Sequence, residues 1–203
     1  MTTLYLGLGA NVGDAVTTLT AAVYALDDID GVSVVDVSSV YVTDPWPPPS
    51  DPRHVPQDPF RNLVVACETV RDADELLRET QLIEAAFGRD RDHEQRWGPR
   101  PLDIDLLLYG ENVCDTPRLT LPHPRITERA FVLVPLMEIA PGLTLPNGER
   151  VTQALAKLAP FDDVVHDVRL DDVPTTRIPR PLGPDGGAAR FDRDGRDDDS
   201  GRR

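Results

Sequence analysis

The segment "RWGPRPLDIDLLLYG" (Arg96–Gly110) ends in a run that has the alternation of a β-strand but not its usual composition. Apolar residues recur at every second position from 102 to 108, and residues two apart in a strand point to the same face. The opposite face carries Asp103 and Asp105. An unpaired buried charge costs several kcal/mol and like charges repel, so two neighbouring carboxylates are unexpected in an apolar strand. We therefore expect a buried strand whose two aspartates have a chemical function.

The patterns on either side of this strand predict an α+β fold. Alternating apolar residues predict strands at 3–10, 31–44, 60–70 and 101–110, and apolar spacing near 3.6 residues predicts helices at 13–29, 72–88 and 127–141. We expect Asp72 or Asp74 to cap the second helix and Thr127 to cap the third. The order strand, helix, strand, strand, helix, strand fits a ferredoxin-like sandwich, an antiparallel sheet with helices on one face.

Two segments between these elements are expected to be long loops. Proline removes backbone donors, so "PWPPPSDPRHVPQDP" (45–59) is not regular structure, and "RDRDHEQRWGPR" (89–100) is strongly polar. From Phe161 onward the apolar periodicity fades into a composition rich in Asp, Arg, Gly and Pro. We expect one domain at 1–160 and a mostly disordered tail at 161–203, although "VVHDVRL" (164–170) also fits an edge strand.

The composition excludes several classes of partner. A formal charge of -14 over 203 residues argues against binding to nucleic acid or an anionic membrane, because both select for basic surfaces. No apolar run approaches the roughly 20 residues needed to span a bilayer, and the N-terminus does not resemble a secretory signal. We expect a cytoplasmic monomer in which Cys67 and Cys114 are free thiols.

The spacing of Asp103 and Asp105 suits a divalent cation. Carboxylates at i and i+2 on one strand face have Cα atoms roughly 6–7 Å apart, so both can reach one ion or one each of two ions. Mg²⁺ fits best, since it takes one or two protein carboxylates and completes its shell with water and phosphates. Two aspartates with this spacing, without other signals, are often only solvated polar side chains. Here it directly follows an arginine-rich loop, and metal plus arginine is how proteins neutralise a transferring polyphosphate.

Familiar nucleotide-binding motifs are missing from the chain. It has no G-x-x-x-x-G-K-S/T loop, and the glycines of "GLGANVGD" (7–14) are spaced one residue too far for a dinucleotide fingerprint. This segment predicts a tight strand-to-helix turn, with Asn11 near a ligand as the alternative. Any phosphates are therefore expected to be held by arginine and metal.

Six segments together carry a resemblance to a known family. They are "GLGANVGD" (7–14), "SSVYVTDPW" (38–46), "FRNLVVACET" (60–69), "RWGPRPLDIDLLLYG" (96–110), "LTLPHPRITERAFVLVPLMEIAP" (119–141) and "LPNGE" (145–149). With them the chain resembles the 6-hydroxymethyl-7,8-dihydropterin pyrophosphokinases of folate biosynthesis. The resemblance implies transfer of the β,γ-diphosphate of ATP to the pterin hydroxymethyl group, giving AMP and the pterin diphosphate.

The resemblance also implies roles for individual residues. It implies that Asp103 and Asp105 bind two Mg²⁺ ions, and that Arg89, Arg96 and Arg100 belong to a flexible loop that closes over the triphosphate of ATP. Nucleotide contacts are implied for Gln81, Glu84, Arg118, Thr120, His123 and Arg129. Pterin contacts are implied for Trp97, Phe131 and Asn62, for the backbone at Thr43, Asp44 and Trp46, and for Phe60, which stands where the family often has tyrosine.

The residues alone favour plainer interpretations of some of these positions. Gln81 and Glu84 fit an exposed helix face, His123 a turn, Phe131 a helix core and Trp97 a loop anchor.

Other departures and functions also remain open. The loop at 88–96 is one residue longer than the family pattern, so Arg91 has no assigned role. Two other functions remain: a noncatalytic ferredoxin-like sensor of a nucleotide or pterin, and a D-x-D sugar-nucleotide transferase, for which the chain is short.

Overall fold

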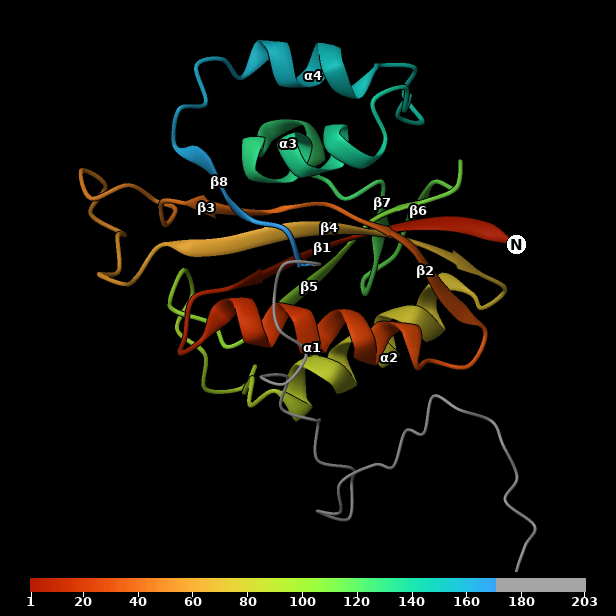
Figure 1. Cartoon of the computed structure of the whole chain (residues 1–203), viewed down its shortest axis with the longest axis horizontal. Coiled ribbons are helices and arrows are strands. Elements are labelled where there is room, and N and C mark those ends of the chain that lie inside the picture. Colours follow the sequence, from red (N-terminus) through yellow and green to blue (C-terminus); the bar gives the residue numbers. More distant parts are fainter. Residues whose placement is uncertain (171–203) are drawn as a thin grey trace, which may run out of the picture.

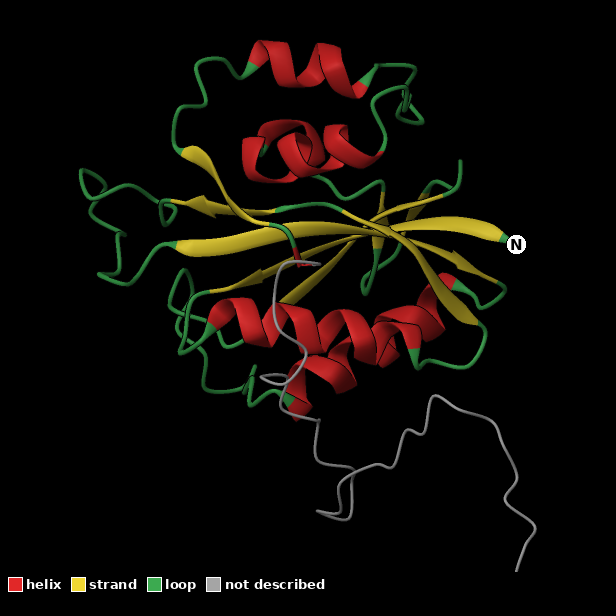
Figure 2. Ribbon diagram, viewed as in Figure 1, coloured by secondary structure: helices red, strands yellow, loops and turns green. Residues whose placement is uncertain are grey.

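Six strands form one antiparallel sheet in the computed structural model, which describes residues 1–170 (Figures 1 and 2). They are β1 (Thr2–Ala10), β2 (Val32–Val37), β3 (Val40–Thr43), β4 (Phe60–Thr69), β5 (Asp103–Tyr109) and β8 (Val164–Val168). Neighbours follow the order β5-β1-β4-β3-β8, and β2 also pairs with β4. The sheet confirms the predicted ferredoxin-like order of strands.

Helices cover both faces of this sheet, so the prediction of helices on one face was wrong. α1 (Ala15–Asp27) and α2 (Ala73–Ala86) lie on one face, and α3 (Ala130–Ile139) and α4 (Val151–Lys157) lie on the other (Figure 1). The reason is visible in β4, where every residue from 62 to 67 is buried. A strand that is apolar on both sides needs cover on both sides.

The alternation of β5 breaks at its end, which corrects the prediction for Leu108. The register of β5 against β1 shifts there: Leu106 pairs with Leu6, and Leu108 pairs with the preceding Tyr5. The bulge turns Leu108 toward the α3 side, where it joins Leu107, whereas Leu106 stays in the core beneath α1 and α2.

The predicted strand at 31–44 is two strands, because the chain breaks at Ser38 and Ser39. Both serines are buried. Glu138 of α3 accepts hydrogen bonds from the Ser39 N–H (2.9 Å) and from the Ser39 hydroxyl (2.9 Å). The break therefore places the buried polar groups of Ser39 within hydrogen-bond distance of the Glu138 carboxylate on α3.

The helix starts were predicted with mixed success. Asp72 caps α2, since its carboxylate accepts from the Glu75 N–H at 2.8 Å. Thr127 does not cap α3; it lies in a 3-10 helix, η1 (Ile126–Glu128), and α3 begins at Ala130.

The last described strand confirms the edge strand expected at 164–170. β8 pairs with β3. The rest of the predicted tail, at 171–203, lies outside the described residues. A small hairpin of β6 (Cys114–Asp115) and β7 (Thr120–Leu121) completes the fold. Among residues 1–170, no helix combines the length and the apolarity needed to cross a bilayer.

We expect the two thiols to differ sharply in reactivity. Cys67 in β4 is fully buried, and burial raises its pKa to about 12, whereas Cys114 is partly exposed. Titration of the native protein with a thiol reagent at pH 8 should modify a single thiol quickly, and unfolding should release the second. Replacing Cys114→Ser should abolish the fast reaction. Two fast thiols in the native parent would contradict the placement of Cys67.

Candidate active site

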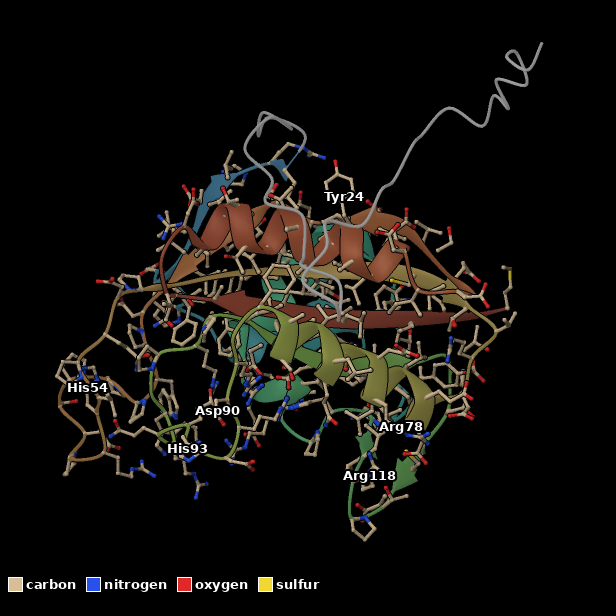
Figure 3. The ribbon with its side chains drawn as sticks, turned by 90° about the horizontal axis from the view of Figure 1, so that it is seen from below. Tyr24, His54, Arg78, Asp90, His93 and Arg118 are labelled. Carbon is tan, nitrogen blue, oxygen red and sulfur yellow. The ribbon has the colours of Figure 1, made fainter. Side chains whose placement is uncertain are left out.

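The strand ends that carry predicted site residues lie side by side at one end of the sheet. Because β1 runs antiparallel to both β4 and β5, its end lies beside the beginnings of those strands. Gly9 pairs with Asn62 on one side and with Asp103 on the other. The two long loops project from this same end, where Figure 3 labels His54 in one loop and His93 in the other.

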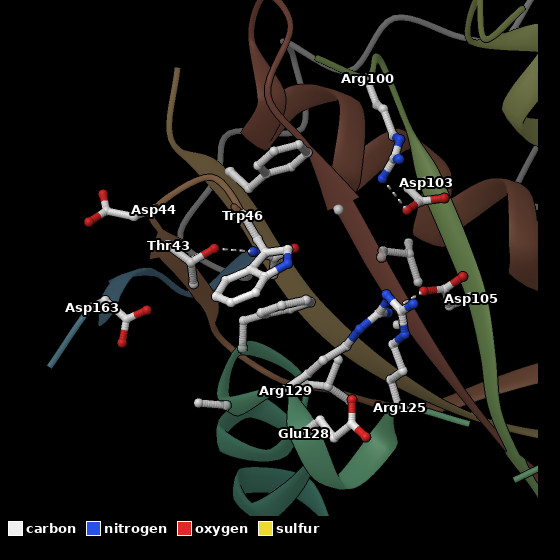
Figure 4. Close-up of a pocket in the computed structure, with 18 of the residues that line it drawn as sticks. Thr43, Asp44, Trp46, Arg100, Asp103, Asp105, Arg125, Glu128, Arg129 and Asp163 are labelled. Carbon is white, nitrogen blue, oxygen red and sulfur yellow. Dashed lines mark hydrogen bonds and ion pairs between the residues drawn. The ribbon is translucent and has the colours of Figure 1, made fainter. Parts of the chain in front are cut away.

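A cavity of about 650 Å³ opens at this end of the sheet (Figure 4). The predicted site residues that line it are Thr43, Asp44, Trp46, Phe60, Asn62, Arg96, Trp97, Arg100, Asp103, Asp105, Arg129 and Phe131. The fold therefore brings together the carboxylate pair, three of the predicted arginines and the aromatic residues, although they come from distant parts of the sequence.

Several lining residues were not predicted. They are Gly7, Arg53, Arg125, Glu128, Phe161 and Asp163, among others. Arg125 and Glu128 lie within a segment that carried the family resemblance, so their position was a usable signal. Phe161 and Asp163 follow the expected end of the domain and gave no signal.

The remaining predicted residues lie outside the main cavity. Gln81, Glu84 and Arg89 line a separate cavity of about 270 Å³. Arg118 and Thr120 belong to the β6–β7 hairpin, and His123 has its Nε2 3.8 Å from Asp105 Oδ2.

Asp103 is surrounded by guanidinium groups. Arg89 donates to one carboxylate oxygen, and Arg100 Nη1 donates to the other at 3.1 Å. Burial alone acts to raise the pKa of Asp103, but the charges of Arg89 and Arg100 together outweigh it and hold the pKa below its ordinary value. Asp103 is therefore an ionised carboxylate that faces the cavity.

Asp105, two residues along the strand, has its own cationic partner. Arg129 Nη1 donates to Asp105 Oδ2 at 3.0 Å (Figure 4). His123 lies on the same side, and burial lowers its pKa against the opposing charge of Asp105. Asp105 thus lies between the guanidinium of Arg129 and the imidazole of His123.

Glu84 lies beneath this site in a buried ion-pair network, so the exposed helix face considered for it is wrong. Its side chain is 1% exposed. It accepts hydrogen bonds from Arg89 Nη1 (2.5 Å), from Arg91 Nε (3.1 Å) and from the Ile104 N–H (2.8 Å). Burial raises the pKa of Glu84, whereas the hydrogen bonds from Arg91 and the Ile104 N–H and the charge of Arg89 act in the opposite direction. Glu84 thereby ties α2 to β5 and fixes Arg89 against Asp103.

Arg89 is consequently buried rather than exposed on a flexible loop. Its side chain is 5% exposed, and it also donates to Glu94. Glu94 accepts from Arg100 as well, with its second oxygen 2.9 Å from Arg100 Nε. One loop carboxylate therefore joins the first and last arginines of the loop.

Asn11 joins three loops at the rim of the cavity. Its Oδ1 accepts from the Arg100 N–H (2.8 Å), and its Nδ2 donates to Gln57 Oε1 (2.9 Å). Gln57 Nε2 in turn donates to the Trp97 carbonyl (2.6 Å). This buried amide connects the first turn with both long loops, and Gly13 supplies the positive φ of 67° that the turn needs.

The other end of the cavity has aromatic walls and a polar edge. Phe131 and Trp46 contribute rings, and the Arg129 guanidinium lies 5.6 Å from the Phe131 ring centroid. Asn62 is buried, and its Nδ2 donates to Thr43 Oγ1 at 2.7 Å. The Asn62 carbonyl oxygen lies beside the backbone of Gly9.

Taken together, fold and site define an α+β transferase for phosphorylated ligands: a ferredoxin-like sheet with a carboxylate pair, an arginine-rich loop and an aromatic compartment in one cavity. Residues 5–141 match the model of the 7,8-dihydro-6-hydroxymethylpterin-pyrophosphokinase (HPPK) family. The chain belongs to this family.

Similar proteins support this placement. The chain is 50% identical over 161 residues to the 2-amino-4-hydroxy-6-hydroxymethyldihydropteridine pyrophosphokinase of Methylorubrum extorquens, covering 79% of this chain and 96% of the relative. It is 40% identical over 161 residues to the enzyme of the same name from Pseudomonas aeruginosa, covering 79% and 94%. The solved wild-type HPPK-DHPS of Plasmodium falciparum matches the fold with a TM-score of 0.57 at 14% identity. That match covers 77% of this chain but 44% of the solved chain.

We expect the Glu84→Ala substitution to lower the free energy of unfolding by about 3 kcal/mol, because it removes one member of a buried ion-pair network. Urea unfolding measures the change. Glu75→Ala on the same helix is the matched control, since Glu75 is 43% exposed and its ion pair with Arg71 contributes about 1 kcal/mol or less. Equal costs for the two substitutions would show that the buried network does not stabilise the fold.

Proposed function

We propose that the chain transfers the β,γ-diphosphate of ATP to the hydroxymethyl group of 6-hydroxymethyl-7,8-dihydropterin, giving AMP and the pterin diphosphate for folate biosynthesis. The observation that carries this proposal is the single cavity that holds Asp103 and Asp105, the loop arginines and the aromatic compartment. A noncatalytic sensor has no need for the carboxylate pair. Membership of the HPPK family supports the reaction, and the named relatives support the substrate.

Asp103 and Asp105 suit Mg²⁺ as donors, and we propose that they hold it. Within residues 1–170, no group of three or more His, Cys, Asp or Glu side chains is placed to hold a metal by itself. A two-carboxylate set suits Mg²⁺, which completes its octahedron with water and substrate phosphates. When bound, Mg²⁺ would neutralise phosphate charge and help align the reacting oxygens.

The arginines around Asp103 carry the electrostatic part of the proposed mechanism. Arg96 and Arg100 line the cavity, and Arg89 stands behind Asp103. As the pterin hydroxyl attacks the β-phosphorus and AMP leaves, these guanidinium groups offset charge on the phosphate oxygens. No covalent intermediate with the enzyme is required, because phosphoryl transfer is accelerated chiefly by positioning and charge neutralisation.

The nucleotide and the pterin would contact different sets of residues. We propose nucleotide contacts for Gln81, Glu84, Arg118, Thr120, His123 and Arg129. For Glu84 the contact is indirect, because its carboxylate is already occupied by Arg89, Arg91 and the backbone.

For the pterin, we propose stacking on Phe131 and Trp97 and recognition of the hydrogen-bonding edge by Asn62. Thr43, Asp44, Trp46 and Phe60 would complete this compartment.

The working unit extends slightly beyond the predicted domain end at residue 160. We propose that the catalytic domain includes β8, because that strand pairs with β3 and because Phe161 and Asp163 line the cavity. We further propose that the protein is a cytoplasmic monomer, in keeping with its acidic charge and with a cavity that one chain completes.

We expect the Asp103→Asn substitution to lower turnover at least about a hundredfold, because an amide lacks the charge needed to hold Mg²⁺. The assay mixes protein, Mg-ATP and 6-hydroxymethyl-7,8-dihydropterin and quantifies AMP and pterin diphosphate by chromatography. Asp74→Asn, an exposed carboxylate at the start of α2, should retain parental turnover. Formation of ADP by the parent would refute the reaction, and normal turnover of Asp103→Asn would refute the metal site.

A separate substitution tests the pterin compartment. A Cβ atom added at Gly9 would meet Asn62 Oδ1 at 2.7 Å, which is too close for either group to stay in place. Gly9→Ala should therefore raise KM for the pterin about tenfold while leaving KM for ATP nearly unchanged. Gly142→Ala, where an added Cβ meets no atom within 4 Å, is the control. A rise confined to KM for ATP would place the pterin elsewhere.

A further inference from the structure

Two of the five arginines that line the cavity have no carboxylate partner among the described residues. The five are Arg53, Arg96, Arg100, Arg125 and Arg129. Arg53 pairs with Asp51, Arg100 with Asp103 and Glu94, and Arg129 with Asp105. Within residues 1–170, no acidic group lies within ion-pair distance of the Arg96 or Arg125 guanidinium, so their charges are left for another partner.

The neighbour that these two arginines share is the Trp97 ring. Arg96 lies 5.0 Å and Arg125 lies 5.8 Å from the ring centroid. At exposed sites a cation–π contact contributes about 0.5–1 kcal/mol. This attraction is small, and the two guanidinium groups beside one ring also repel each other. An anion between the guanidinium groups would relieve their repulsion.

Arg125 stands on a firmly fixed segment. Its N–H donates to His123 Nδ1 (3.1 Å), and its carbonyl accepts from the Glu128 N–H (3.1 Å). The next residue, Ile126, is 4% exposed. The His123 N–H donates to the Leu107 carbonyl of β5 (2.9 Å), so this segment is attached to the strand that carries the carboxylate pair. Arg96, by contrast, belongs to the long loop between α2 and β5.

The direction of the Arg125 side chain points to the ligand class. Figure 4 shows Arg125 and Arg129 extending from the same segment toward Asp105. Arg129 forms an ion pair with Asp105, whereas Arg125 does not. Among the described residues, Arg125 is therefore a cation without a carboxylate partner, and it lies between the carboxylate pair and Trp97. Under the proposed function, the phosphate groups and the pterin would meet in this part of the cavity.

Trp97 itself is held in an unusual conformation. Its φ of 69° is positive, which costs on the order of 1–3 kcal/mol for a residue other than glycine and persists only when neighbouring contacts fix it. Gln57 donates to its carbonyl. The Trp97 backbone is thus held in place, and its ring lies between Arg96 of the long loop and Arg125 of the segment attached to β5.

We propose that Arg125, together with Arg96, forms an anion subsite that binds the diphosphate group during its transfer, with Trp97 as the shared platform. The choice of ligand rests on the proposed function, since a diphosphate is the anion that passes between the two compartments. The planar guanidinium fork suits two phosphate oxygens at once, and an ammonium group does not reproduce this geometry.

The direct test is binding of inorganic pyrophosphate in the presence of Mg²⁺, measured by titration calorimetry. Arg125→Gln should weaken binding about tenfold, the effect of losing one charge-assisted hydrogen bond. Arg125→Lys should fall between the parent and Arg125→Gln, because it keeps the charge without the fork. Arg78→Gln should bind like the parent, since Arg78 is exposed on α2 and does not line the cavity (Figure 3).

A spectroscopic arm separates anion binding from simple packing. In a Trp46→Phe variant, the tryptophan fluorescence comes from Trp97 alone. Pyrophosphate should change the Trp97 emission of this variant, and should change it much less when Arg125→Gln is added. Unchanged pyrophosphate affinity in Arg125→Gln would overturn the proposal, as would equal loss in Arg78→Gln or no binding by the parent. Normal pyrophosphate binding combined with no AMP formation would instead count against the proposed function alone.

Discussion

The ion pairs between Asp103 and its surrounding guanidinium groups are the interaction on which the rest of the site depends. Two aspartates on a strand with an apolar opposite face are tolerated because Arg89 and Arg100 contact one carboxylate and Arg129 contacts the other. Arg89 can be buried because Glu84 and Glu94 pair with it in addition to Asp103. The strand, helix α2 and the long loop are thereby joined through charge as well as through apolar packing.

This arrangement makes ligand binding an exchange of partners. Under the proposed function, phosphate oxygens would replace the carboxylate partners of Arg89 and Arg100, and Mg²⁺ would replace the guanidinium partners of Asp103. Glu94, which accepts from both arginines, competes with the phosphates. Such an exchange would limit the desolvation cost of bringing a highly charged ligand into the cavity, because each charge would keep a partner of opposite sign.

Local patterns in the sequence predicted most elements of the fold, and long-range packing decided the rest. The periods of the strands and of α1 and α2 are visible in short windows, as is the cap at Asp72. The placement of α3 and α4 on the second face of the sheet is not visible in any short window. A strand that is buried on both faces, such as residues 62–67, does not indicate which elements cover it. The bulge that turns Leu108 depends on the register of β5 against β1, and the strand break at Ser38–Ser39 depends on Glu138 of α3. These are tertiary effects that no window contains.

The same division explains the site. Asp103 and Asp105 were found because a pair of carboxylates breaks the pattern of its own strand. Glu84 looked like surface, because its helix is polar and its decisive partner, the Ile104 N–H, lies 20 residues away on β5. Arg125 lies in a segment that carried the family resemblance, but its residue type alone did not set it apart, because an arginine in a polar motif is unremarkable until its neighbours are known. Among residues 1–170, Arg125 and Arg96 have no carboxylate partner, whereas the other three arginines of the cavity have one, and that property belongs to the folded arrangement rather than to any stretch of the chain.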